Sequence, residues 1–113
     1  MNWKELHESV RAKVGPFEHD SEGPLTPEEA AHLRMAGLRF QYAGAKEEAI
    51  LNVLGTSPWR HHQTVNALLD RPESMEHNGG EFAPTVKRLQ RQRDERRKGR
   101  ALSPRQWPET GTS

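Results

Sequence analysis

Residues 46–71, KEEAILNVLGTSPWRHHQTVNALLDR, predict two helices joined by a tight turn. In residues 46–54 the apolar side chains recur at helical spacing and not in the alternation of a strand. Gly55 suits the left-handed conformation in which many helices end. Ser57 is a good N-cap for a second helix, and Pro58 fits its first position, where a missing N–H costs nothing. We therefore expect a helix, a short turn and a second helix.

The second helix of this stretch has two chemically different faces. We expect it to continue to about Leu69. Its inward stripe consists of His61, Thr64 or Val65, and Leu68. Its outward face carries polar and aromatic side chains, namely Trp59, Arg60, His62, Gln63 and Asn66. A helix divided in this way packs one side on a core and presents the other to solvent or to a partner.

Two short helices with a glycine-containing turn are typical of a helix-turn-helix, whose second helix enters the major groove of DNA. Arginine pairs with guanine, and asparagine or glutamine with adenine, each through two hydrogen bonds. The candidate base-reading residues are Trp59, Arg60, Gln63 and Asn66. The candidate phosphate contacts are Lys46, Thr56, Ser57, His62, Lys87, Arg88 and Arg91. The same pattern also fits a helical hairpin that only packs, and the sequence leaves that alternative open.

The chain before this stretch predicts a supporting helix. Thr26 can cap it, Pro27 takes its first position, and Glu29 completes a capping box. We expect this helix to end near residue 44 and residues 26–71 to form the helix-turn-helix core. Its inward stripe would be Ala31, Met35, Leu38 and Tyr42. Two arginines lie off that stripe and are expected to be solvated, namely Arg34 and Arg39.

The flanking segments divide by composition. Residues 1–14 predict an amphipathic helix that docks on the core or on a partner. Residues 15–25, with two Gly-Pro pairs, predict a linker, and residues 72–83 predict a mobile loop. Residues 84–100 predict a basic helix, and residues 101–113 a disordered tail.

The basic helix has two interpretations. In its first turns only Val86 and Leu89 are apolar, and lysines and arginines surround them. Such a run can neutralise phosphates, with an affinity that falls as salt rises. It can equally be a solvated, partly frayed helix. Residues 1–83 hold 8 Lys/Arg and 13 Asp/Glu, whereas residues 84–113 hold 9 and 3, so the basic arm seeks a polyanion or folds back on the acidic part.

Length and composition favour an all-α domain with a small core. The chain has 113 residues, 32% of them hydrophobic, which suits a three-helix core with solvated flanks. It has no cysteine, and no apolar run approaches the roughly 20 residues of a membrane span. The first ten residues lack the apolar region of a secretory signal. We expect a cytoplasmic protein without membrane contact.

Four segments resemble a domain of unknown function that is common in actinobacteria and their phages. They are QYAGAKEEAI at 41–50, LGTS at 54–57, NALLDRPE at 66–73 and VKRL at 86–89. The resemblance covers about residues 26–93, and members are usually described as helix-turn-helix DNA-binding proteins. It implies that fold and a DNA-binding role. The turn is also similar to the DNA-reading region of sigma factors.

One position departs from that family. Members tend to have two aromatic residues where this chain has His61 and His62. The first of the pair should face the core, and a buried histidine must find a hydrogen-bond partner or lower stability. The substitution His61→Tyr is therefore expected to raise stability by about 1 kcal/mol.

The sequence lacks the motifs of an enzyme. It has no HExxH, no phosphate-binding glycine loop and no nucleophile elbow. The adjacent His61 and His62 do not have the i, i+4 spacing of a helical zinc site. We expect no catalysis, no cofactor and no metal.

Two main functions and one further alternative remain. The first is sequence-specific binding of double-stranded DNA, with a role in transcription regulation. One recognition helix usually provides too little contact, so a homodimer or the basic arm should add more. The second is a helical module that binds a host protein such as RNA polymerase, which an exposed Trp59 would favour. An arm that binds RNA is a third alternative.

Overall fold

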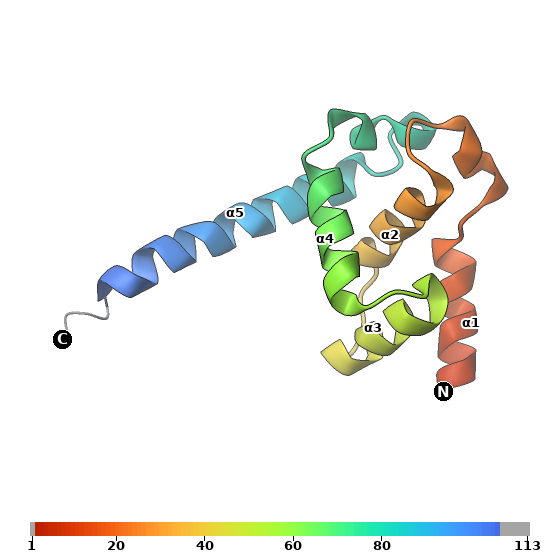
Figure 1. Cartoon of the computed structure of the whole chain (residues 1–113), viewed down its shortest axis with the longest axis horizontal. Coiled ribbons are helices and arrows are strands. Elements are labelled where there is room, and N and C mark those ends of the chain that lie inside the picture. Colours follow the sequence, from red (N-terminus) through yellow and green to blue (C-terminus); the bar gives the residue numbers. More distant parts are fainter. Residues whose placement is uncertain (1, 107–113) are drawn as a thin grey trace.

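The computed structural model describes residues 2–106, with side chains through residue 99, and all of its regular elements are helical (Figure 1). The α-helices are α1 (Trp3–Val14), α2 (Pro27–Gly37), α3 (Ala43–Ala49), α4 (Pro58–Leu69) and α5 (Ala83–Gln106). A π-helical turn, η2 (Ile50–Leu54), continues α3. The short 3-10 helices are η1 (Glu18–Glu22), η3 (Pro72–Met75) and η4 (His77–Gly79). The predicted all-α fold is confirmed.

The signals that start and stop the central helices act as the sequence predicts. Ser57 Oγ accepts a hydrogen bond from the backbone N–H of Arg60 at 3.1 Å. Gly55 has φ +68°, the left-handed conformation that ends the preceding helix. Thr26 and Glu29 form the expected capping box. The turn of three residues between η2 and α4 thus contains both the residue that ends η2 and the side chain that caps α4.

Helix α2 is the scaffold on which the other helices pack. One side of it joins a core cluster with α4 and α5, formed by Leu25, Ala30, Leu33, Val65, Leu68, Leu69, Phe82 and Val86. Its other side joins a cluster with α1, α3 and η2, formed by Val10, Val14, Ala31, Met35, Ala49 and Ile50. The N-terminal helix therefore docks on the core of its own chain, which was one of its two predicted positions.

The predicted continuous helix over residues 26–44 is wrong. Helix α2 ends at Gly37, and α3 begins at Ala43 after a non-helical segment. Leu38 and Phe40 still pack against the α1 cluster from this segment. Tyr42, predicted to face inward, is 59% exposed. The break redirects the chain so that α3 packs on α1 and η2 packs on both α1 and α2. Helical periodicity does not reveal such a tertiary requirement.

The predicted linker and the predicted mobile loop are both ordered. Residues 18–22 form η1, and η3 and η4 lie within residues 72–83. Three polar side chains in these segments are completely buried, namely Asp20, Ser74 and His77. Ser74 donates its hydroxyl to the carbonyl of Leu68 at 2.8 Å. These two segments form a cap over one end of α2.

The cap is held by Arg34, which was predicted to be solvated and is instead buried. Its guanidinium bonds Asp20 at 2.6 and 2.8 Å, Glu81 at 2.7 and 3.0 Å, and the carbonyl of Val14 at 3.2 Å. All five of its N–H donors are thereby used. Its central carbon lies 4.6 Å from the ring centre of Phe17. We call Asp20, Arg34 and Glu81 the arginine cap.

Helix α5 begins one residue earlier than predicted and projects from the globule (Figure 1). Val86 is buried and Leu89 packs on the core, as expected. Residues 101–106, predicted to be disordered, belong to this helix, and residues 107–113 lie outside the described part of the chain. Within residues 2–106, no helix combines the length and apolarity needed to cross a membrane.

Candidate nucleic-acid interface

The outward face of α4 is the first component of the candidate interface. All five residues predicted to lie there are exposed, namely Trp59, Arg60, His62, Gln63 and Asn66. His61, Val65 and Leu68 are buried on the opposite side. Trp59, Gln63 and Asn66 follow one another at i, i+4 and i+7, so they form a line along the helix. The predicted division of this helix into two faces is confirmed.

The buried side of α4 rests on a histidine pair. His61 is 1% exposed, and its Nδ1 lies 2.8 Å from Nδ1 of His32 on α2. The two ring planes are inclined by 21°, and the ring centres are 5.0 Å apart. Such a contact requires that one Nδ1 carries a proton and the other accepts it. Burial, with the charges of His32 and Lys46 adding to it, lowers the pKa of His61 to about 3, so this ring is neutral near pH 7.

This pair changes the expectation for His61→Tyr. The expected gain assumed a buried histidine that costs stability. His32 supplies the hydrogen-bond partner, and a tyrosine would leave His32 without its present one. The physical basis for a gain is therefore absent, although the inward position of His61 is as predicted.

The turn and the basic helix form the second component. Thr56 is half-buried, and Ser57 is exposed and keeps its hydroxyl hydrogen free to donate while it caps α4. Lys46 is half-buried, and burial followed by the positive charge of Arg88 lowers its pKa. The positive charge of Arg88 on α5 thus acts on Lys46 of α3, although the two residues are far apart in sequence.

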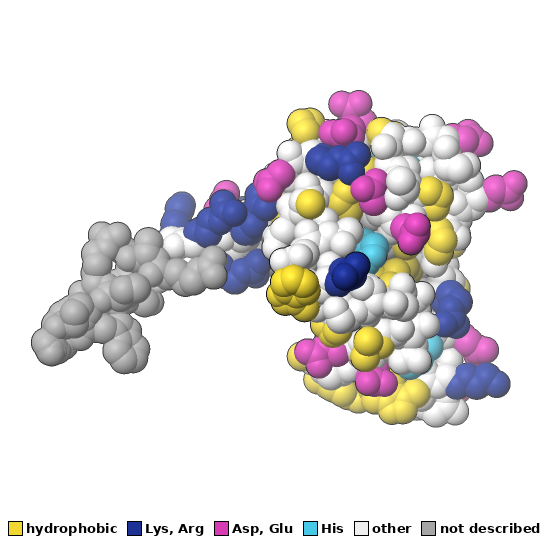
Figure 2. Space-filling model, viewed as in Figure 1, with side chains coloured by type: hydrophobic (Ala, Val, Ile, Leu, Met, Phe, Trp, Pro, Cys, Tyr) yellow, Lys and Arg dark blue, Asp and Glu magenta, His cyan; other side chains and the backbone are white. Residues whose placement is uncertain are grey.

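The outer face of α5 is densely basic (Figure 2). Lys87 and Arg91 are exposed and one helical turn apart, and Arg88 beside them is half-buried. Arg93 has a different role, because its Nη2 bonds Asp70 Oδ1 at 2.9 Å and its Nη1 the Asn66 carbonyl at 3.5 Å. This arginine attaches α5 to α4.

Gln90 makes the same attachment stronger. Its side-chain N–H donates to the carbonyl of Leu69 at 2.7 Å. The last carbonyls of a helix have no partner within that helix, so Gln90 and Arg93 cap the C-terminal end of α4. We did not predict these roles. The signal was present in their spacing from Val86 and Leu89, which places them on the packed side of α5.

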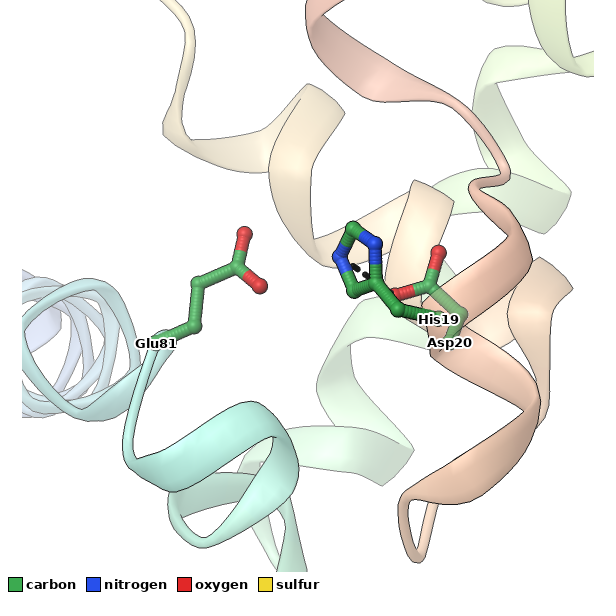
Figure 3. A group of neighbouring side chains, drawn as sticks. All are labelled: His19, Asp20 and Glu81. Carbon is green, nitrogen blue, oxygen red and sulfur yellow. Dashed lines mark ion pairs between the residues drawn. The ribbon is translucent and has the colours of Figure 1, made fainter.

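A third group of side chains resembles a metal site. His19, Asp20 and Glu81 each offer a ligand atom, and these atoms lie within 4.8 Å of one another (Figure 3). The Arg34 guanidinium already bonds both carboxylates, and those bonds hold the pKa of Asp20 and of Glu81 below their usual values. A cation would have to displace a buried arginine. We therefore assign the two carboxylates to the arginine cap and not to a metal centre.

Comparison with known families supports one assignment. The model of a family described as "Protein of unknown function (DUF3263)" matches residues 24–101. The chain belongs to this family. The DUF3263 region spans α2 to α5 and leaves α1 outside. No curated protein and no solved structure matches the chain significantly. The DUF3263 description carries no activity, so function has to be argued from the geometry of the interface.

Proposed function

We propose that this protein binds double-stranded DNA sequence-specifically through a helix-turn-helix formed by α3–η2 and α4, and regulates transcription in an actinobacterium or its phage. The observation that supports this most is the outward face of α4. Arg60, Gln63 and Asn66 are all exposed there, on a helix fixed from below by Val65, Leu68 and the histidine pair. Side chains on rigid elements hold the geometry that base recognition needs.

In this mode of binding the exposed residues from the first turn of the second helix onward meet base edges. Arg60 would pair with guanine, and Gln63 and Asn66 with adenine, with about 1–3 kcal/mol of discrimination for each good pair. Trp59, 67% exposed, would contact a thymine methyl or a sugar. The hydroxyls of Thr56 and Ser57 and the ring of His62 would bond phosphates beside the turn.

Helix α5 supplies the second part of the proposal. Lys87, Arg88 and Arg91 lie near its attachment to the core, and Lys46 adds to the same positive region. These groups would neutralise phosphates next to the groove that α4 occupies. Such contacts add affinity without sequence preference and weaken as salt rises.

A host protein such as RNA polymerase is the second candidate partner. The supporting observation is the exposure of Trp59, because tryptophans are frequent anchors of protein interfaces. In that case the polar residues of α4 would surround an apolar contact and would not read bases.

The experiment that separates the two is selection of DNA sequences by the full chain, followed by gel-shift titration of the selected site over a salt series. Arg60→Ala with Gln63→Ala removes two such pairs, so it should weaken binding to the selected site by at least about 30-fold and leave binding to random DNA almost unchanged. The matched control is Gln92→Ala with Arg96→Ala, which removes the same residue types from exposed positions of α5. The control should weaken both DNAs alike. Unchanged sequence preference in the α4 variant would refute the proposal.

A further inference from the structure

A second surface lies at the end of the molecule formed by α1, residues 38–42 and α3. Its centre is made by Trp3 and Tyr42, and its two ends carry opposite charges. We call this the bipolar surface and define it by Trp3, Lys13, Arg39, Tyr42, Glu47, Glu48 and Leu51. None of these residues belongs to the candidate DNA interface.

The centre of the bipolar surface is unusually apolar. Four large hydrophobic side chains are exposed among the described residues, and three of them lie here: Trp3 at 47%, Tyr42 at 59% and Leu51 at 47%. Figure 2 shows hydrophobic side chains gathered along the edge over α3 and the N-terminal end of α1. Beside Trp3 and Tyr42 opens a groove of about 700 Å³, which Leu6, Leu38 and Phe40 also line. Exposed apolar areas of this kind mark interaction sites.

The charges of the surface are separated. Lys13 and Arg39 are the charged residues of the groove on one side of the Trp3–Tyr42 centre. Glu47 and Glu48 are those of a shallower depression on the other side, which Leu51 and Pro58 complete. All four charged side chains are exposed.

The separation of basic and acidic residues indicates which partner binds the bipolar surface. A two-fold axis that lies in the plane of the contact, at right angles to the line between the two ends, brings the basic end against the acidic end of an identical copy and the apolar centre against itself. A uniformly charged surface would repel its copy, and this one attracts it. We propose that the bipolar surface binds a second copy of the chain and forms a symmetric dimer.

Such a dimer would extend the proposed function, because it would present two copies of α4 to DNA. The biological role of the dimer therefore rests on the proposed function. Pro58, the first residue of α4, lies at the edge of the bipolar surface. Two copies of α4 would then flank the dimer interface, and both could contact one DNA duplex at paired half-sites. Association itself requires only the bipolar surface and can be measured without DNA.

The test is sedimentation equilibrium of the full chain over a concentration series up to about 100 μM, a range that detects micromolar dissociation constants. The wild type should form dimers. Lys13→Glu with Arg39→Glu makes both ends acidic, and Glu47→Lys with Glu48→Lys makes both ends basic. Each variant alone should dimerise at least about tenfold more weakly, because like charges then face each other.

An equimolar mixture of the two variants provides the decisive measurement. The acidic ends of one should attract the basic ends of the other, so the mixture should recover dimers of mixed composition, which native mass spectrometry identifies. Lys87→Glu with Arg91→Glu on α5 is the control, since it changes the same number of charges outside the surface. Far-UV circular dichroism checks that each variant is folded.

The outcomes are distinct. A monomeric wild type, a dimer unaffected by the end charges, or a mixture that stays monomeric would each overturn the proposal. Dimers without sequence-specific DNA binding would support this inference and refute the proposed function. A monomer that still binds its selected DNA through α4 would support the proposed function and refute the dimer.

Discussion

The arginine cap and the outward face of α4 both depend on an arginine in a helix, yet the two arginines behave in opposite ways. Arg34 of α2 is buried and uses every donor to hold segments of its own chain together. Arg60 of α4 is exposed, with its side chain directed away from the core. An arginine in a helix is therefore buried or exposed according to the partners that the rest of the chain brings to it.

The largest expected effect tests the structural arginine. Arg34→Ala would leave Asp20 and Glu81 close together without their counter-charge, and Asp20 is completely buried. Removal of one partner from a buried ion pair typically costs about 3–5 kcal/mol. We expect this loss in the free energy of unfolding, measured by urea denaturation. A loss below about 1 kcal/mol is the range of surface ion pairs, and it would mean that the arginine cap does not hold η1 against residues 72–83.

The next effect concerns pH and the histidine pair. Burial lowers the pKa of His61 to about 3, whereas an unfolded histidine has a pKa near 6.5. The unfolded state therefore binds more protons between these values, and the free energy of unfolding should fall as pH decreases from about 6.5 towards 3. The pKa of Asp20 is also below its usual value, so its contribution is lost only below about pH 4.

Burial also lowers the pKa of His32, so both members of the histidine pair act between about pH 6.5 and 4.5, whereas the carboxyls with lowered pKa act at lower pH. Urea denaturation at pH 7, 6, 5 and 4 therefore separates the histidine pair from the carboxyls. We expect a decrease of a few kcal/mol by pH 4, as each unit of separation between the two pKa values is worth about 1.4 kcal/mol. The NMR signal of the His61 ring should meanwhile remain that of the neutral form. A constant free energy of unfolding from pH 7 to pH 4.5 would contradict the buried, neutral His61.

The smallest effect on stability is expected at the exposed Arg60. Arg60→Ala with Gln63→Ala removes exposed side chains from α4, so the free energy of unfolding should change by no more than about 0.5 kcal/mol. Thermal denaturation of this variant beside Arg34→Ala measures the contrast directly. A strong destabilisation would show that Arg60 supports the fold, and it would remove the basis for interpreting its loss of DNA binding.

The same contrast explains what the sequence could predict. The faces of α4, the Ser57 cap and the Gly55 turn follow from local rules, because each depends on residues at most four positions apart. The arginine cap depends on contacts between residues 14 and 47 positions apart. Helical periodicity counts Arg34 simply as polar and off the apolar stripe, so it assigns the residue to solvent.

The segments beside the cap were mispredicted for a related reason. Glycine, proline and acidic residues in 15–25 and 72–83 are typical of loops, and these segments do lack long helices. Their order comes from buried polar contacts, such as the bond from the Leu25 N–H to Nδ1 of His77 at 3.2 Å. The composition of a segment does not reveal such a partner. The candidate site is easier to predict, because an exposed helix face can be identified from its own sequence without a distant partner.

The attachment of α5 to α4 gives the projecting helix a mechanical role. Helix α5 has 24 residues and thus extends about 36 Å at 1.5 Å per residue, while its side-chain bonds to α4 lie within its first half, at Gln90 and Arg93. A load on its distal end acts through a long lever on the last turn of α4. A partner bound to the distal part of α5 would consequently tilt or steady the exposed residues of α4 without touching them.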